Sequence, residues 1–282
     1  MNRLLNYATG LLVIYLFVLE GNMEDHIRII TGLVLSVSFG YIAFIFNWIT
    51  LDASRTIVVL GTIIYGFGNW LMVSAVLFFF ITSIIFSRYH RKSKIAKLDE
   101  AEISALNLQK RRKGTQLWAN GFWMAFFIIA WYLYPTHGFL IAVFAVIASA
   151  ASDTWATELG SANPWKTRLI TSFKKVKPGT DGGISLKGIA AALLGSAAIA
   201  LFTFLDTSLS SPLTFYIVFG AGFLGCITDS YLGAIFQNRV SDKSGNNPDT
   251  ETGANLSNSM VNWISTGTGG MIAFVFTQLL LI

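Results

Sequence analysis

The chain has 282 residues, of which 54% are hydrophobic and only 12% are charged, whereas about a quarter of the residues in typical soluble domains are charged. This composition excludes an ordinary soluble domain and predicts an all-α, polytopic transmembrane helical bundle. The single cysteine, Cys226, excludes an intramolecular disulfide and a cysteine-cluster metal site, and the three scattered histidines form no metal motif. We expect membrane lipids around the chain and no nucleic-acid partner.

Apolar runs recur along the whole sequence and predict about nine spans within one domain, 1–282. A spanning helix needs roughly 20 residues, so the stretch 52–87 is too long for one helix. We expect it to break between Gly66 and Asn69 into a hairpin with a short first arm. The first run is expected to be a retained span, because no small-residue cleavage pattern follows it. The predicted spans are 3–20, 27–48, 52–67, 69–87, 116–134, 138–158, 186–205, 212–236 and 258–281.

Basic residues gather in the loops on one side of these spans. Nine Lys and Arg lie between Arg88 and Lys113, and six lie between Lys166 and Lys187. Positive loops mark the cytoplasmic side, so we expect an integral cell-membrane protein with its N-terminus in the cytoplasm and its C-terminus outside. Arg28 would be the only basic residue outside. The cytoplasmic loops would be 88–115, 159–185 and 237–257, and within the first of them 93–108 is either an interfacial helix or a solvated loop.

Two aspartates, Asp153 and Asp229, each end an uncharged apolar run. A carboxylate in or near hydrocarbon costs a few kcal/mol and is usually paired, solvated or functional. Each aspartate lies four residues after a small residue, Ser149 or Gly225, on the same helix face, and small-residue stripes let membrane helices approach closely. We therefore expect the two helices to pack with their aspartates meeting near the cytoplasmic surface. Close packing with two helix caps is the alternative.

Three polar segments accompany the aspartates. The glycines and lysines of KPGTDGGISLKG at 177–188 suit a phosphate or other anion before a helix, although a plain turn also explains them, and the segment is not a Walker A loop. KRRKGTQLWANG at 110–121 is either a positive-inside anchor or a phosphate clamp. The asparagines of 255–262 share a helix face and either line a polar cavity or pair with neighbouring helices. The loop 245–253 before them either closes over a site or is a linker.

The residue types favour a hard cation. Mg²⁺ is commonly bound by one or two carboxylates together with substrate phosphates, and phosphoryl transfer mainly requires positioning, metal charge and Lys or Arg donors. Glu158 lies about 140° around a helix from Asp153, which makes it a weaker ligand candidate than either aspartate. The residues alone indicate a reaction class, and ion-coupled transport would also use intramembrane acids.

Five motifs in order, KRRKGTQLWANG, SDTWATELG, KPGTDGGISLKG, TDSYLGAIFQ and NLSNSMVN, resemble those of the integral membrane proteins known as domain-of-unknown-function family 92. The resemblance covers essentially the whole chain. That family includes the transmembrane protein 19 group and the phytyl-phosphate kinases of plants and cyanobacteria. Its kinases convert an isoprenyl monophosphate to the diphosphate, with CTP as the expected donor. The family also looks distantly similar to dolichol kinases and CDP-diacylglycerol synthases, which depend on divalent metal.

The resemblance implies Mg²⁺ as cofactor, CTP as co-substrate and an isoprenyl-phosphate lipid as acceptor, at a site facing the cytoplasm. The implied metal ligands and catalytic groups are Asp153 and Asp229, with Glu158 as a weaker third ligand and Lys177 as a further catalytic residue. The nucleotide would contact Gly179, Thr180, Asp181, Gly182, Gly183, Ser185 and Lys187. The substrate phosphate would contact Arg111, Arg112, Lys113, Asn120, Asn258 and Asn262. The alternatives are a CTP-dependent lipid cytidylyltransferase and a membrane transporter or lipid translocase, and the sequence sets no oligomeric state.

Overall fold

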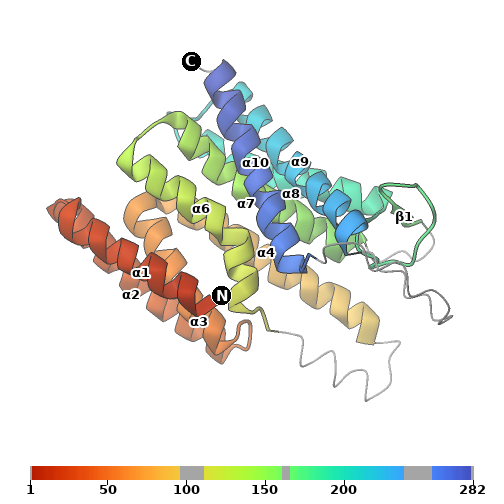
Figure 1. Cartoon of the computed structure of the whole chain (residues 1–282), viewed down its shortest axis with the longest axis horizontal. Helices are drawn as coiled ribbons and strands as arrows, with labels where there is room; N and C mark the ends of the chain where they lie inside the picture. Colours follow the sequence, from red (N-terminus) through yellow and green to blue (C-terminus); the bar gives the residue numbers. More distant parts are fainter. Residues whose placement is uncertain (1, 96–110, 161–165, 238–255, 281–282) are drawn as a thin grey trace.

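The computed structural model describes residues 2–95, 111–160, 166–237 and 256–280, and within these ranges it is almost entirely helical (Figure 1). The α-helices are α1 (Asn2–Leu19), α2 (Met23–Ile45), α3 (Leu51–Ile63), α4 (Trp70–Ile95), α6 (Gly114–Leu133), α7 (His137–Gly160), α8 (Leu186–Ala200), α9 (Pro212–Phe236) and α10 (Asn258–Leu280). The short elements are the π-helix η1 (Ile64–Gly68), the 3-10 helix η2 (Leu201–Leu205) and the strands β1 (Arg168–Leu169) and β2 (Gly183–Ile184). The predicted interfacial helix lies outside the described residues except for 93–95, which continue α4, and the loop 245–253 lies wholly outside them.

Seven helices are long and apolar enough to cross a membrane: α1, α2, α4, α7, α8 continued by η2, α9 and α10. Each coincides closely with a predicted span, so the all-α, polytopic bundle is confirmed. The other two predicted spans fall short of this measure. Helix α3 has only 13 residues, and the 20 residues of α6 begin with the polar Thr115, Gln116 and Asn120. The side on which each terminus lies stays a prediction.

The long apolar stretch 52–87 breaks where the sequence predicts. Helix α3 passes into η1, which ends at Gly68, and the side chain of Asn69 accepts the amide of Met72 at 3.0 Å to begin α4. A Cβ added at Gly66 would lie 2.9 Å from the Cα of Ile29, so this glycine lets α2 cross η1 at close range. The first arm is short, as predicted, but the two arms have different partners: α3 packs mainly on α2 and α6, whereas α4 packs mainly on α7.

Helix α7 is the centre of the bundle and packs against α4, α6, α8, α9 and α10. Every residue from Leu140 to Ser152 is buried. Ser149 lies between Gly225 of α9 and Gly269 of α10, and a Cβ on either glycine would overlap its side chain. The small residues therefore allow three helices to meet almost at backbone contact, as the predicted stripes require. Figure 1 shows α1–α3 on one flank of the molecule and α8–α10 on the other.

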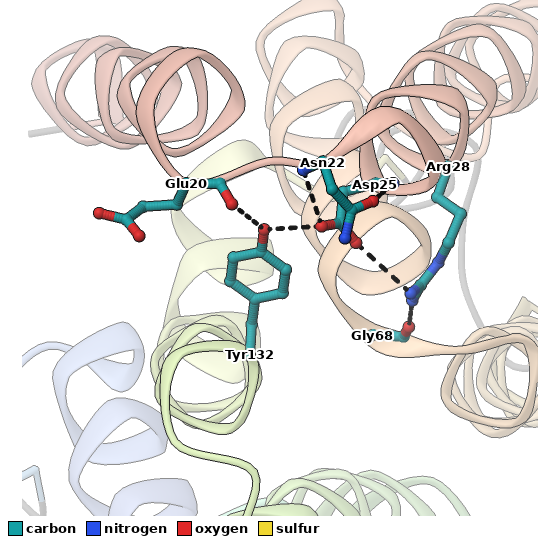
Figure 2. Close-up of polar contacts among 6 residues, drawn as sticks. All are labelled: Glu20, Asn22, Asp25, Arg28, Gly68 and Tyr132. Carbon is teal, nitrogen blue, oxygen red and sulfur yellow. Dashed lines mark hydrogen bonds and ion pairs between the residues drawn. The ribbon is translucent and has the colours of Figure 1, made fainter.

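A polar cluster joins α2, η1 and the last turn of α6 (Figure 2). Arg28 donates a hydrogen bond to the carbonyl of Gly68 and lies 3.9 Å from Asp25. Tyr132 donates to the same carboxylate at 3.2 Å, and the amide of Asn22 donates to it as well. Asp25 is only 9% exposed, so these contacts compensate a nearly buried charge. They also give a structural role to Arg28, the one basic residue predicted to lie outside, because its side chain contacts Gly68 and Asp25.

Replacing Arg28 with methionine should lower the stability of the fold. The change removes a charged donor from Gly68 and the counter-charge of Asp25, a loss of about 1–3 kcal/mol. We expect a lower midpoint of thermal unfolding in detergent. Arg55→Met, at an exposed position of α3, should leave the midpoint unchanged. Equal midpoints for the two variants would show that the cluster does not stabilise the bundle.

Candidate functional site

A cavity of about 550 Å³ lies at the end of the bundle where α7 and α9 finish and α8 and α10 begin. This volume is within the range of small-molecule sites, roughly 300–1,000 Å³. The first turns of α6, a late turn of α4, the α2–α3 link and the loop between α7 and α8 complete its wall. Of the residues predicted to form a site, those that line it are Arg111, Arg112, Asn120, Asp153, Glu158, Gly179, Thr180, Asp181, Gly182, Gly183, Ser185, Asp229, Asn258 and Asn262.

The structure brings Asp153 and Asp229 together in this cavity. Their carboxyl groups lie close enough to act on each other electrostatically, and Asp229 accepts a hydrogen bond from the Ser265 hydroxyl at 3.0 Å. Within the described part of the chain neither carboxylate forms an ion pair with a basic residue. Two carboxylates in contact repel each other unless a cation or a shared proton lies between them. The pair is therefore chemically incomplete without one of these.

The donor set fits a metal ion that is shared with a ligand. Among the described residues, no group of three or more His, Cys, Asp or Glu side chains is placed to hold a metal, so a closed protein cage is absent there. Two carboxylates would leave most positions of a Mg²⁺ ion to water and phosphate oxygens, which is its usual arrangement. Asn262 supports this fit. Its amide nitrogen donates to Asn120 at 3.3 Å, but its buried Oδ1 has no hydrogen-bond partner and could accept from a ligand or a metal-bound water.

Glu158 faces a different part of the cavity. Helix α7 is continuous to Gly160, so Asp153 and Glu158 lie on different faces of it. The carboxylate accepts a hydrogen bond from Ser87 of α4 at 2.5 Å and acts electrostatically on Arg112. These contacts keep Glu158 the weakest of the three candidate metal ligands.

The glycine-rich segment forms part of a small β-hairpin in which Arg168 of β1 lies opposite Ile184 of β2. It offers fewer free amides than the sequence suggests, because the amides of Thr180 and Gly183 donate to carbonyls within the loop at 3.1 and 2.9 Å. The Ser185 hydroxyl caps α8 by accepting the Gly188 amide at 3.1 Å. The feature that favours an anion here is therefore the N-terminus of α8 beside the cavity.

Three of the predicted residues do not line the cavity: Lys113, Lys177 and Lys187 are all exposed. Lys187 follows the cap of α8, whereas the next residue, Gly188, faces α7 and lies against Gly160. Neighbouring residues of the same segments line the cavity, but the sequence pattern does not set the direction of these lysine side chains.

Several cavity residues were not predicted. Arg88 stands at the start of the first basic cluster, and its position at the end of an apolar run could have identified it. Trp48 and Thr167 had no such pattern. The indole nitrogen of Trp48 and the hydroxyl of Thr167 are both buried without a hydrogen-bond partner, and Thr167 is only 5% exposed. A buried polar atom without a partner is costly, so these atoms are candidates for ligand contacts.

Charge divides the cavity into an acidic end and an arginine end. The acidic end holds Asp153 and Asp229, with Asp181 near enough to act on Asp229; partial removal from water raises the pKa of Asp181. The arginine end holds Arg88, Arg111 and Arg112. Burial lowers the pKa of Arg112, while the charge of Glu158 raises it. An arginine nevertheless stays protonated at neutral pH, so the two ends carry opposite charge.

The fold and the cavity define a helical integral membrane protein with a charged, ligand-sized site at one end of its bundle. The model of the integral membrane protein family DUF92 matches residues 34–270, and the chain belongs to that family.

An uncharacterized membrane protein of Methanocaldococcus jannaschii is 32% identical over 76% of this chain and 79% of its own length. Two Arabidopsis thaliana proteins match more partially. Protein PGR is 36% identical over 42% of this chain and 48% of its own length, and Protein VTE6, chloroplastic, is 29% identical over 51% and 39% respectively. The chain thus spans less than half the length of either plant relative. No solved structure matches the chain.

Gly182→Ala should detach the hairpin from α9. Gly182 has a φ of +73° and an added Cβ would lie 2.4 Å from the backbone nitrogen of Ala234, so neither the conformation nor the space admits a side chain. We expect faster trypsin cleavage after Lys174 and Lys175 in the folded protein. Gly179→Ala is the matched control, because Gly179 also has a positive φ, +84°, but open space around it. Equal cleavage rates for the two variants would contradict tight docking of the hairpin.

Proposed function

We propose that this protein is a Mg²⁺- and CTP-dependent kinase that phosphorylates an isoprenyl monophosphate to the diphosphate at the cytoplasmic face of the membrane. The observation that carries the proposal is one cavity, within a membrane-spanning bundle, that combines two aspartates with three arginines; in the described part of the chain neither aspartate forms an ion pair with a basic residue. Joining two polyanions requires a cation beside the transferred phosphoryl group and basic groups for the flanking phosphates. A cavity of uniform charge would meet only one of these needs.

In this reaction an oxygen of the acceptor phosphate attacks the γ-phosphorus of the donor, and the bond to the β–γ bridging oxygen breaks to release CDP. A phosphate oxygen is already ionised, so no protein base and no covalent enzyme intermediate are needed. Asp153 and Asp229 would hold Mg²⁺, which when bound supplies positive charge where negative charge develops. The donor phosphates would lie against residues 179–183 and the N-terminus of α8.

The support for an isoprenyl acceptor is the resemblance of the five motifs to those of the phytyl-phosphate kinases, together with membership of an integral membrane family. The location of the cavity agrees with such a substrate. Its wall combines charged groups with apolar residues of the bundle, such as Ile84, Ile189 and Phe223. A prenyl chain could therefore lie among helices while its phosphate meets the charged groups.

Transport is less well supported, because the cavity occupies only one end of the bundle. Its helical wall residues come from late turns of α4, the last turns of α7 and α9, and the first turns of α6, α8 and α10. The rest of α7, from Leu140 to Ala151, is closed core. A translocase needs a path that continues through this region.

Purified protein with Mg-CTP and farnesyl or geranylgeranyl monophosphate should yield the prenyl diphosphate and CDP, as detected by mass spectrometry. EDTA should abolish turnover. Asp153→Asn and Asp229→Asn should each lower the rate by about 100-fold or more, the loss typical of removing one electrostatic contact to a transition state. Glu24→Gln, an exposed carboxylate at the start of α2, should keep the wild-type rate.

A CDP-lipid with pyrophosphate would instead identify a cytidylyltransferase. Movement of a lipid or ion in proteoliposomes without nucleotide turnover would identify a transporter. Near-normal activity of both aspartate variants would remove the metal site from the proposal.

A further inference from the structure

The arginine end of the cavity is built from two separate parts of the chain. Arg88 comes from α4, and Arg111 and Arg112 come from the segment before α6. Glu158 is the carboxylate that interacts with this group, through its electrostatic effect on Arg112. Among the described residues, three positive charges therefore face one negative charge, and that carboxylate already accepts a hydrogen bond from Ser87.

Arg112 is the most constrained of the three. Its guanidinium group lies over the ring of Phe80, 5.7 Å from the centroid, and is largely removed from water. In the part of the chain that the structure describes, no carboxylate lies within 4.0 Å of it, and no side-chain hydrogen bond from it is formed. A guanidinium carries five N–H donors, and a desolvated charge without a partner is strongly unfavourable. The guanidinium donors of Arg112 are therefore available to an anionic ligand.

The α2–α3 link, residues 46–50, fixes the position of this arginine pair. The backbone of Arg112 donates to the carbonyl of Trp48 at 3.0 Å and accepts from the amide of Thr50 at 3.0 Å. Asn47, whose φ is +58°, accepts a hydrogen bond from the side chain of Arg111. These contacts hold Arg112 by its backbone and leave its side chain free to serve a ligand.

Arg88 closes the group from the other side. Its guanidinium lies over the indole of Trp48, 5.9 Å from the ring centroid, and the indole nitrogen of that residue is itself buried without a partner. Trp48 therefore belongs to the link that holds Arg112 and also lies beneath the guanidinium of Arg88. Arginine suits a phosphate because its planar fork can donate two parallel hydrogen bonds.

We propose that Arg88, Arg111 and Arg112 form one binding site for the phosphate of a phosphomonoester, separate from the aspartate pair and independent of metal, with Arg112 as its anchor. The choice of a prenyl phosphate as the ligand rests on the proposed function. The site differs from the set implied by the motifs, since it gains Arg88 and loses the exposed Lys113. Glu158, held by Ser87, leaves a net positive charge that matches a phosphate group.

The test measures binding without catalysis. Full-length protein in nanodiscs is titrated with farnesyl monophosphate in the presence of EDTA and without nucleotide, and farnesol serves as the uncharged ligand of the same chain length. Arg88→Ala and Arg112→Lys should each raise the Kd for farnesyl monophosphate by about tenfold or more, as expected for loss of charge-assisted hydrogen bonds. Neither change should alter the weak binding of farnesol. Arg55→Ala, an exposed arginine that does not line the cavity, should bind farnesyl monophosphate like the wild type.

Wild-type affinity of both arginine variants, or an equal loss in Arg55→Ala, would overturn this site. Failure of the wild-type protein to bind farnesyl monophosphate better than farnesol would overturn it as well. Arg88 is exposed, so Arg88→Ala keeps the test valid if Arg112→Lys does not fold. Binding of farnesyl monophosphate without metal, but with no phosphoryl transfer in the activity assay, would reject the kinase and retain the site. Phosphoryl transfer by a protein whose arginine variants keep wild-type affinity would retain the kinase and reject the site.

Discussion

The close approach of α7, α9 and α10 around Ser149 is the constraint on which the rest of the structure depends. Gly225 and Gly269 leave no room for a Cβ beside this serine, so the helix axes can come together only with glycine at both positions. One turn beyond Ser149 and Gly225 along their helices are Asp153 and Asp229. The same packing that builds a dry core therefore forces two carboxylates into contact where that core ends. A larger residue in either stripe would separate the helices and the acids together.

The opposite charges in the cavity stay apart because different elements hold them. The aspartates are fixed by α7 and α9, whereas the arginines are fixed by α4 and by the backbone pairing of Arg112 with the α2–α3 link. If the arginines formed ion pairs with the aspartates, both charges would be neutralised within the protein and neither would attract a ligand. Holding them apart keeps the acids available to a cation and the guanidinium groups available to an anion. Such preorganised charge is most effective in a site shielded from water.

Much of the fold was predictable from sequence, because long apolar runs and the break before Asn69 are local features. The meeting of Asp153 and Asp229 followed from helical periodicity and the small residues one turn before each. The arginine end was only half predictable. Arg111 and Arg112 stood out by charge, but the α2–α3 link, whose backbone pairs with Arg112, lies in a distant part of the sequence, and no local pattern encodes that contact. In the hairpin, the amides of Thr180 and Gly183 donate to carbonyls of the loop itself, so they are not free to bind an anion as the glycine-rich sequence suggests.

The central position of α7 also bears on what kind of protein can use this cavity. Alternating access requires one group of helices to move against another around a fixed site. Helix α7 packs against five other helices and carries both Asp153 and Glu158, so moving it would break the Ser149 contacts and expose a continuous buried surface. A catalytic site has the opposite need, since groups must stay within a fraction of an ångström of their working positions. The rigidity imposed by the glycine contacts is thus a cost for a transporter and an advantage for an enzyme that joins two phosphates.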